Sequence, residues 1–249
     1  MTEELFRDDA TLRACDARIT AVSAAGVELD RTVFYPQGGG QAGDRGLLRL
    51  ADGRELAIAD TRKAARDGAA PGGIVHVPAP GQDALVSALA AGDAVNACID
   101  TERRTRHMRF HTATHLLCAL IPHPVNGCSI TAEYARLDFH MTETLDKQTL
   151  NAGLARLIAE AHPVRHRWIS EAELDANPQL VRSMSVQPPR GAGRVRVLEI
   201  EGVDLQPCGG THVANTAQIG PLIVTKIEKK SATTRRVVLG FAEPAEGRG

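Results

Sequence analysis

The sequence has few aromatic residues and no long hydrophobic run. Only 3% of its 249 residues are Phe, Trp or Tyr, so a folded core has to consist mainly of Val, Leu, Ile and Ala. No stretch approaches the roughly 18 consecutive apolar residues that a membrane-spanning helix needs. The first ten residues, MTEELFRDDA, are acidic and contain no apolar segment, which argues against a signal peptide. We therefore expect a globular protein of the cytoplasm.

A framework of paired cysteines is also missing. The cysteines are odd in number and scattered along the chain, namely Cys15, Cys98, Cys118, Cys128 and Cys208. This usage is typical of a reducing compartment and predicts no set of disulfides. A cysteine with a special role is then expected to be a metal ligand or a nucleophile.

Neither sign of charge dominates, because the formal net charge is -1. The distribution is less even: residues 1–100 carry 10 Lys and Arg against 15 Asp and Glu, whereas residues 101–249 carry 19 against 15. A polyanionic partner would therefore bind more easily to the second part, although chance variation between two domains gives the same pattern.

The pattern of apolar residues changes near residue 100. Before it, short strand-like segments such as ARITAVSA, GVELD and ELAIAD are separated by Gly, Pro and Asp, which predicts a small barrel or sandwich. After it, two segments have helical periodicity and several have strand character, including RVRVLEI and RRVVLGF. We predict an α+β fold, with a β-barrel domain at residues 1–100 and an α+β domain at residues 101–249.

Two motifs with four-residue spacing indicate a metal site. His111 and His115 lie one turn apart on the predicted helix, so that both imidazoles can face one ion. Cys208 and His212 repeat the spacing within PCGGTH, where two glycines allow a tight turn. Three imidazoles and one thiolate form a donor set that favours zinc.

Other interpretations of these motifs remain open. Two histidines on a helix are more often ordinary core or surface residues, and His107 and Cys118 are rival ligands. The motif lacks the Glu of HExxH, which disfavours a zinc protease of that type. Four protein ligands usually mean a structural ion, so His212 is either a permanent ligand or one that gives way to water or substrate.

The two motifs together resemble a known family. HTATHLL and CGGTH, in this order, are similar to the editing domain of alanyl-tRNA synthetase and to its free-standing AlaX-type relatives. The upstream stretch DRTVFYPQGGGQAGDRG resembles the glycine-rich segment of the small barrel that precedes this editing domain. The resemblance covers most of the chain.

The resemblance implies a trans-editing hydrolase that cleaves the ester joining serine, and as a second candidate glycine, to the alanine tRNA. It implies a Zn²⁺ cofactor held by His111, His115, Cys208 and His212. It also implies that substrate-binding residues are Thr114, which matches a pocket-lining position, Asn126, near where relatives often carry Gln, and the glycines Gly38, Gly39 and Gly40.

Basic residues suggest where a tRNA would bind. One cluster lies at the start of the predicted helix that carries His111 and His115. It includes Arg103, Arg104, Arg106 and Arg109. A second cluster comprises Lys226, Lys229, Lys230, Arg235 and Arg236. We expect phosphate contacts chiefly from Arg103, Arg104, Arg106, Lys229 and Lys230, although either cluster could also be an ordinary solvated face.

Two other functions compete with this one. A threonyl-type editing domain shares the two metal motifs, and a non-catalytic tRNA-binding module would use zinc only for structure. No general base stands out in the sequence. Asp138 and Glu133 lie nearby but are expected to be ordinary strand or surface carboxylates.

Overall fold

A computed structural model of the protein describes residues 2–64, 73–185, 187, 188, 191 and 193–242. The chain forms two compact units. Unit 1 comprises residues 1–38 and 42–105, and unit 2 comprises residues 39–41 and 106–249. The division lies a few residues beyond position 100, and it assigns part of the glycine-rich segment to unit 2.

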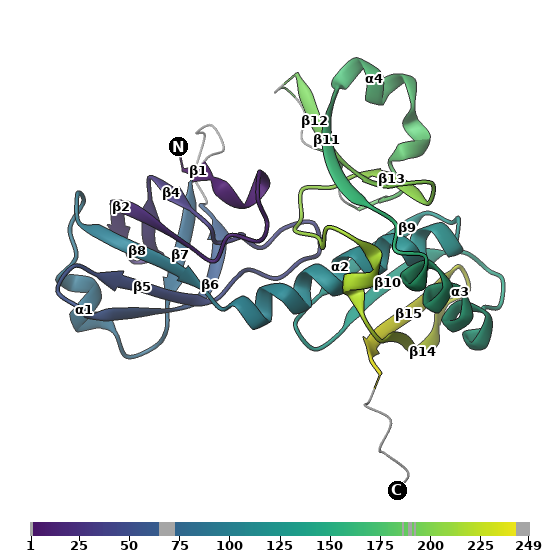
Figure 1. Ribbon diagram of the computed structural model, residues 1–249, viewed down its shortest axis with the longest axis horizontal. Helices are drawn as coiled ribbons and strands as arrows, with labels where there is room; N and C mark the ends of the chain where they lie inside the picture. The colour runs from purple at the N-terminus through teal and green to yellow at the C-terminus, as the bar shows by residue number, and fades with distance from the viewer. Residues whose placement is uncertain (1, 65–72, 186, 189–190, 192, 243–249) are drawn as a thin grey trace, which may run out of the picture. The chain divides into compact units, whose positions relative to one another are not determined.

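Unit 1 is a closed antiparallel barrel, as the sequence predicts (Figure 1). Its strands follow the order β2 (Ala14–Ser23), β3 (Gly26–Leu29), β7 (Ile74–Pro78), β6 (Glu55–Lys63), β5 (Gly46–Leu50) and β8 (Ala94–Ile99). Alternate residues such as Val27, Leu48, Leu56 and Ala97 point inward and are fully buried. Closure pairs every strand on both sides, so that none of these six strands exposes a free edge.

Short elements accompany the barrel. Strand β1 (Glu3–Glu4) pairs in parallel with β4 (Arg31–Thr32), and the 3-10 helix η1 (Leu5–Arg7) follows β1. Helix α1 (Asp83–Ser87) connects β7 to β8. These pieces are too short to be recognised from hydrophobic periodicity.

Unit 2 contains most of helix α2 (Thr101–Leu120) and two antiparallel sheets (Figure 1). The larger sheet has the order β14 (Leu222–Ser231), β15 (Thr234–Phe241), β10 (Ala135–His140) and β9 (Val125–Ile130). The smaller has the order β11 (Val164–Ser170), β12 (Arg194–Ile200) and β13 (Asp204–Pro207). This mixture confirms the predicted α+β class. Among the described residues, no helix is long and apolar enough to cross a membrane.

The remaining helices of unit 2 are shorter. Helix α3 (Lys147–Ala159) packs against β14 and buries Leu150, Leu154 and Leu157. Asp146 caps it, because its carboxylate accepts a hydrogen bond from the Thr149 amide (2.7 Å). Helix α4 (Glu171–Ala176) and the 3-10 helices η2 (Pro178–Leu180) and η3 (Thr216–Ile219) complete the unit.

Strand β9 differs from the sequence-based expectation. The segment SITAE at residues 129–133 has strand character in the sequence, whereas β9 runs from Val125 to Ile130. Asn126 and Gly127 are poor strand formers, but pairing with β10 outweighs this local preference.

Helix α2 is more deeply buried than its sequence suggests. Its apolar residues predict one buried face, but residues 110–118 are all buried. A helix enclosed on all sides belongs to a protein interior. The histidines of this segment are therefore presented to the core and not to solvent.

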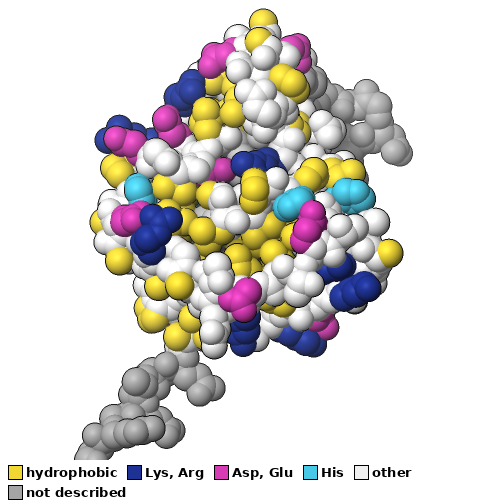
Figure 2. Space-filling view, turned by 90° about the vertical axis from the view of Figure 1, so that its right-hand side faces the viewer, with side chains coloured by type: hydrophobic (Ala, Val, Ile, Leu, Met, Phe, Trp, Pro, Cys, Tyr) yellow, Lys and Arg dark blue, Asp and Glu magenta, His cyan; other side chains and the backbone are white. Residues whose placement is uncertain are grey.

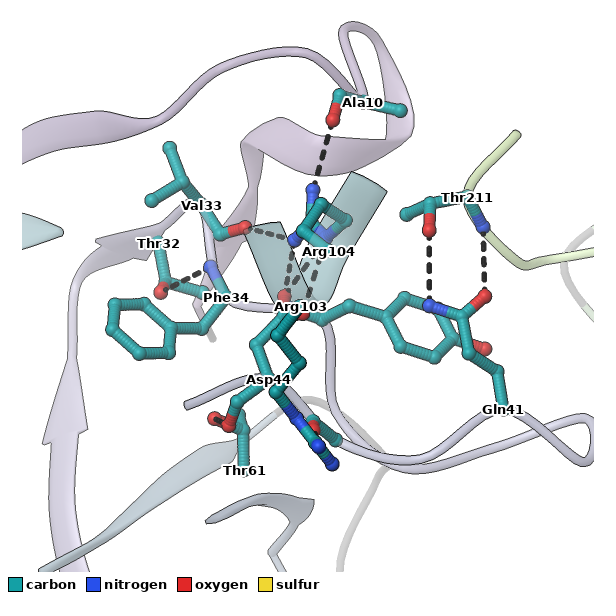
Figure 3. Close-up of polar contacts among 12 residues, drawn as sticks. Ala10, Thr32, Val33, Phe34, Gln41, Asp44, Thr61, Arg103, Arg104 and Thr211 are labelled. Carbon is teal, nitrogen blue, oxygen red and sulfur yellow. Dashed lines mark hydrogen bonds and ion pairs between the residues drawn. The ribbon is translucent and has the colours of Figure 1, made fainter. Parts of the chain in front are cut away.

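Arg104 has a structural role instead of the expected tRNA contact. Its side chain is only 2% exposed and forms an ion pair with Asp44, which is 1% exposed. The guanidinium also donates hydrogen bonds to the carbonyls of Val33 (2.7 Å) and Ala10 (2.9 Å) (Figure 3). Asp44 in turn accepts from the Tyr35 amide (2.7 Å). Arg104 is thus withdrawn from the surface and is not available to a tRNA phosphate.

We expect Asp44→Ala to destabilise unit 1 strongly, because it leaves the Arg104 charge buried without its partner. Removal of one member of a buried pair costs about 3–5 kcal/mol. The measurement is the midpoint of chemical denaturation, monitored by circular dichroism of the β-strands. Glu55→Ala, which breaks the exposed Arg49–Glu55 pair, is the control and should leave the midpoint nearly unchanged. Equal effects of the two variants would contradict this assignment.

Candidate metal centre

His111 and His115 project from the same side of α2. They are 5% and 7% exposed, and their ring centroids are 5.6 Å apart. This proximity follows from their spacing, because residues four apart on a helix are neighbours. The helix therefore supplies two neighbouring imidazoles, with ring planes inclined by 28°, to the interior of unit 2.

The loop at residues 208–212 brings a thiol and a third imidazole to the same place. It follows β13 directly, and Arg196 fixes its path by donating to the carbonyls of Cys208 (2.9 Å) and Gly210 (3.1 Å). A Cβ atom on Gly210 would lie 2.2 Å from the ring of His111. Only glycine at this position allows the loop to approach the helix so closely.

The side chains of His111, His115, Cys208 and His212 converge. One donor atom from each lies within 4.8 Å of the others, and the Cys208 sulfur is 3.2 Å from His212 Nε2 and 3.5 Å from His111 Nε2. In a tetrahedral zinc site, donor atoms are about 3.3–3.6 Å apart. The cluster could thus hold a metal ion after a small closure. The rivals His107 and Cys118 are not part of it.

Hydrogen bonds turn each imidazole toward the centre of the cluster. Nδ1 of His111 contacts Gln41 Oε1 (2.8 Å), and Nδ1 of His115 contacts Asp204 Oδ2 (2.8 Å). Nδ1 of His212 contacts the Thr112 hydroxyl (3.3 Å). An Nδ1 that donates outward leaves Nε2 with its lone pair for a metal, which is the usual arrangement of metal-ligating histidines. The residues present therefore fit a metal ion.

Burial and neighbouring groups also set the protonation states of the donors. Burial alone would raise the pKa of the Cys208 thiol, but His111 and His212 outweigh it and hold that pKa well below its usual value. Burial lowers the pKa of His212 to about 3, so this ring is neutral. A thiolate and a neutral imidazole are the forms that bind metals.

His115 behaves differently. Burial would lower its pKa, but hydrogen bonds with Asp204 and Cys208 outweigh burial and raise it to about 10. A metal ion would have to displace this proton. Cys118, in contrast, is an inert core thiol, because burial raises its pKa to about 12.

Three residues that orient the ligands are missing from the sequence-based prediction, namely Gln41, Thr112 and Asp204. Gln41 lies 70 positions before its histidine partner, and Asp204 lies 89 positions after its own. Sequence spacing gives no signal for such distant pairs. Thr112, in contrast, lies beside His111 and could have been considered as a helix neighbour.

The residues expected to bind substrate lie in different parts of the structure. Thr114 is buried, and its hydroxyl donates to the carbonyl of His111 (2.7 Å), which leaves its oxygen able to accept. Asn126 donates to Thr234 Oγ1 (3.3 Å) within the larger sheet. Gly38 belongs to unit 1, whereas Gly39 and Gly40 belong to unit 2.

The first basic cluster is largely engaged with the protein itself. Arg106 and Arg109 both stack on Phe241, with guanidinium-to-centroid distances of 4.4 Å and 4.2 Å. Arg106 also donates to the carbonyl of Ala132 (2.5 Å). Arg103 is half-buried and has a long contact with the Gly43 carbonyl (3.5 Å).

The second basic cluster is only partly available. Arg235 is 9% exposed and donates to backbone carbonyls, and Arg236 forms a bidentate pair with Asp138. The hydrogen bond from Arg236 lowers the pKa of Asp138, which makes this carboxylate a weak base. Lys229 and Lys230 are exposed on β14. Figure 2 shows a face on which Lys and Arg lie among Asp and Glu, so the described side chains there form no patch of one sign.

Comparison with known proteins locates this site in a family. Residues 195–238, which include Cys208 and His212, match the family described as the threonyl and alanyl tRNA synthetase second additional domain. The match begins within β12, ends within β15 and includes the loop that carries two of the four cluster residues.

Relatives align over nearly the whole chain. The alanyl-tRNA editing protein AlaX-M of Methanosarcina mazei is 32% identical over 99% of both chains, and that of Methanosarcina barkeri is 35% identical over 95% of this chain and 98% of its own. The alanine–tRNA ligase of Pyrococcus furiosus is 31% identical over 98% of this chain, but over only 26% of its own length. The chain therefore belongs to the family of alanyl-tRNA editing proteins of the AlaX-M type.

Proposed function

We propose that this protein is a zinc-dependent aminoacyl-tRNA deacylase that removes serine, and as a second candidate glycine, from the alanine tRNA. The observation that carries this proposal is the buried cluster of His111, His115, Cys208 and His212, in a chain that aligns end to end with alanyl-tRNA editing proteins. Three imidazoles and a thiolate are donors that zinc prefers.

The ion could be held by all four donors, or by three of them with the fourth position open to water or substrate. When bound, zinc would supply a Lewis acid that polarises the ester carbonyl and lowers the pKa of water. Because four protein ligands close a tetrahedral site, one of them has to yield for substrate or water to enter. His212 is the best candidate, since the Nδ1 contact that orients it is 3.3 Å, against 2.8 Å for His111 and His115.

The physical need for such an enzyme follows from the size of serine. A pocket shaped for the methyl group of alanine rejects an isostere with one more hydroxyl by only about 10². A second site that hydrogen-bonds the hydroxyl can discriminate by about 10⁴ or more, because its polar groups stay unpaired with alanine. We propose that Thr114 lines this site, since its oxygen can still accept a hydrogen bond.

Two alternatives have specific support. The matched domain family includes threonyl-tRNA synthetase, so a threonyl-type substrate is an alternative, although the relatives named above, which align over at least 95% of this chain, are alanyl proteins. A non-catalytic tRNA-binding module is favoured by the four-ligand set, which is typical of structural zinc. Such a module would bind tRNA without releasing an amino acid.

We also propose that the tRNA backbone contacts Lys229 and Lys230, with smaller contributions from the half-buried Arg103 and Arg106. Replacing both lysines by alanine should weaken tRNA binding. The slope of log K against log salt concentration should decrease in magnitude by about 1–2, because each phosphate contact contributes about 0.7–0.9 to it. Filter binding at several salt concentrations measures this. Arg54→Ala in unit 1, an exposed cation paired with Asp52, is the control. An unchanged slope in the double variant would place the tRNA elsewhere.

The test of selectivity compares deacylation of the seryl and alanyl forms of one tRNA. We expect rapid release of serine and little release of alanine. Thr114→Val keeps the shape of the side chain but removes a hydrogen-bond partner worth about 0.5–1.5 kcal/mol, so discrimination should fall roughly threefold to tenfold.

The control for this variant is Thr105→Val on the same helix, where the hydroxyl is exposed and bonds only the Thr101 carbonyl (2.8 Å). It should leave discrimination unchanged. Equal rates on the two tRNAs with the wild-type protein would refute the editing function. A loss of discrimination that is as large in Thr105→Val would refute the role of Thr114.

A further inference from the structure

Gln41 ends the glycine-rich segment and is completely buried within unit 2. Its side chain makes three contacts (Figure 3 shows the two with Thr211). Nε2 donates to Thr211 Oγ1 (2.9 Å), and Oε1 accepts from the Thr211 amide (3.2 Å). The same Oε1 lies 2.8 Å from Nδ1 of His111. One amide thus contacts both the metal helix and the loop at residues 208–212.

The Thr211 contact fixes which way the amide points. A backbone N–H can only donate, so the atom that faces it has to be the carbonyl oxygen of Gln41. An oxygen at this position can only accept from His111, which places the imidazole hydrogen on Nδ1. In the neutral ring that binds a metal, Nε2 of His111 then carries the lone pair, and this atom lies 3.5 Å from the Cys208 sulfur.

The backbone of the glycine-rich segment lies close enough to β9 and to the loop at residues 208–212 for Gln41 to contact His111. The carbonyl of Gly40 accepts a hydrogen bond from the Ile130 amide (2.8 Å), which ties the segment to β9. A Cβ atom on Gly40 would lie 2.7 Å from the Cys128 sulfur. On the opposite side, a Cβ on Gly210 would lie 3.1 Å from Gln41 Oε1. Glycines on both sides therefore allow the amide to reach His111.

We propose that Gln41 is a positioning residue of the metal centre. It fixes the tautomer of His111 and, through Thr211, ties the loop that carries Cys208 and His212 to the helix that carries His111 and His115. This inference rests on the proposed zinc site. Its consequence is that the glycine-rich segment contributes to metal affinity as well as to any contact with substrate.

The expected size of the effect comes from the role of such outer partners, whose loss typically weakens metal binding 10–100-fold. Gln41→Leu keeps the approximate volume and removes all three contacts. Gln41→Glu retains an oxygen that accepts from His111 Nδ1 and from the Thr211 amide. Gln37→Leu, at an exposed position in the same segment, is the matched control.

The experiment measures the zinc dissociation constant of each variant by competition with a chromophoric chelator, together with thermal unfolding of the metal-free proteins. We expect Gln41→Leu to bind zinc about 10–100-fold more weakly, and Gln41→Glu to stay within about threefold of the wild type because it keeps the acceptor. Gln37→Leu should match the wild type. All metal-free variants should remain folded at the assay temperature, with Gln41→Leu somewhat less stable because it loses three buried hydrogen bonds.

The inference is overturned if Gln41→Leu binds zinc as the wild type does, or if Gln41→Glu is as weak as Gln41→Leu. Should Gln41→Leu fail to fold, Thr211→Val removes the acceptor of Gln41 Nε2 and should still weaken zinc binding, whereas an unchanged constant refutes the proposal. A wild-type protein without zinc affinity would instead contradict the proposed function itself.

Discussion

The orientation of three buried imidazoles is the constraint on which the metal centre depends. An imidazole in a protein interior can present either nitrogen, and only the hydrogen bond at the other nitrogen decides which one is available to a metal. His111, His115 and His212 each have an outer partner at Nδ1, and the three partners are an amide, a carboxylate and a hydroxyl. The helix, the loop at residues 208–212 and the glycine-rich segment are arranged so that these contacts can form.

Burial gives the same residues their chemistry. The residues of α2 near the histidines are enclosed, which alone would raise the Cys208 pKa, but the close His111 and His212 outweigh burial and hold that pKa well below its usual value. The same enclosure makes charged groups costly unless they are paired or hydrogen-bonded, as Arg104 is with Asp44 and Arg235 is with backbone carbonyls. Arginines that look like an RNA-binding cluster in the sequence therefore serve in large part to join the protein's own elements.

Local sequence was sufficient for the barrel, for the long helices and for the four cluster residues, because each of these depends on spacing within a short segment. The four-residue repeats of HTATH and CGGTH are of this kind. Gln41 and Asp204 could not be identified in this way, since they meet their histidines only after the chain has folded. The burial of Arg104, which was expected to contact tRNA, could not be predicted for a related reason: a run of arginines does not reveal which of them finds a buried carboxylate.

We propose that an ion held by His111, His115, Cys208 and His212 enables release of serine from the alanine tRNA. The most direct measurement is deacylation of seryl-tRNA by the purified protein as isolated, after removal of metal by a chelator, and after zinc is restored. The account predicts activity in the first sample, loss in the second and recovery in the third, with tRNA binding retained throughout. Full activity in the metal-free protein, or tRNA binding without any serine release in the zinc-loaded protein, would contradict it.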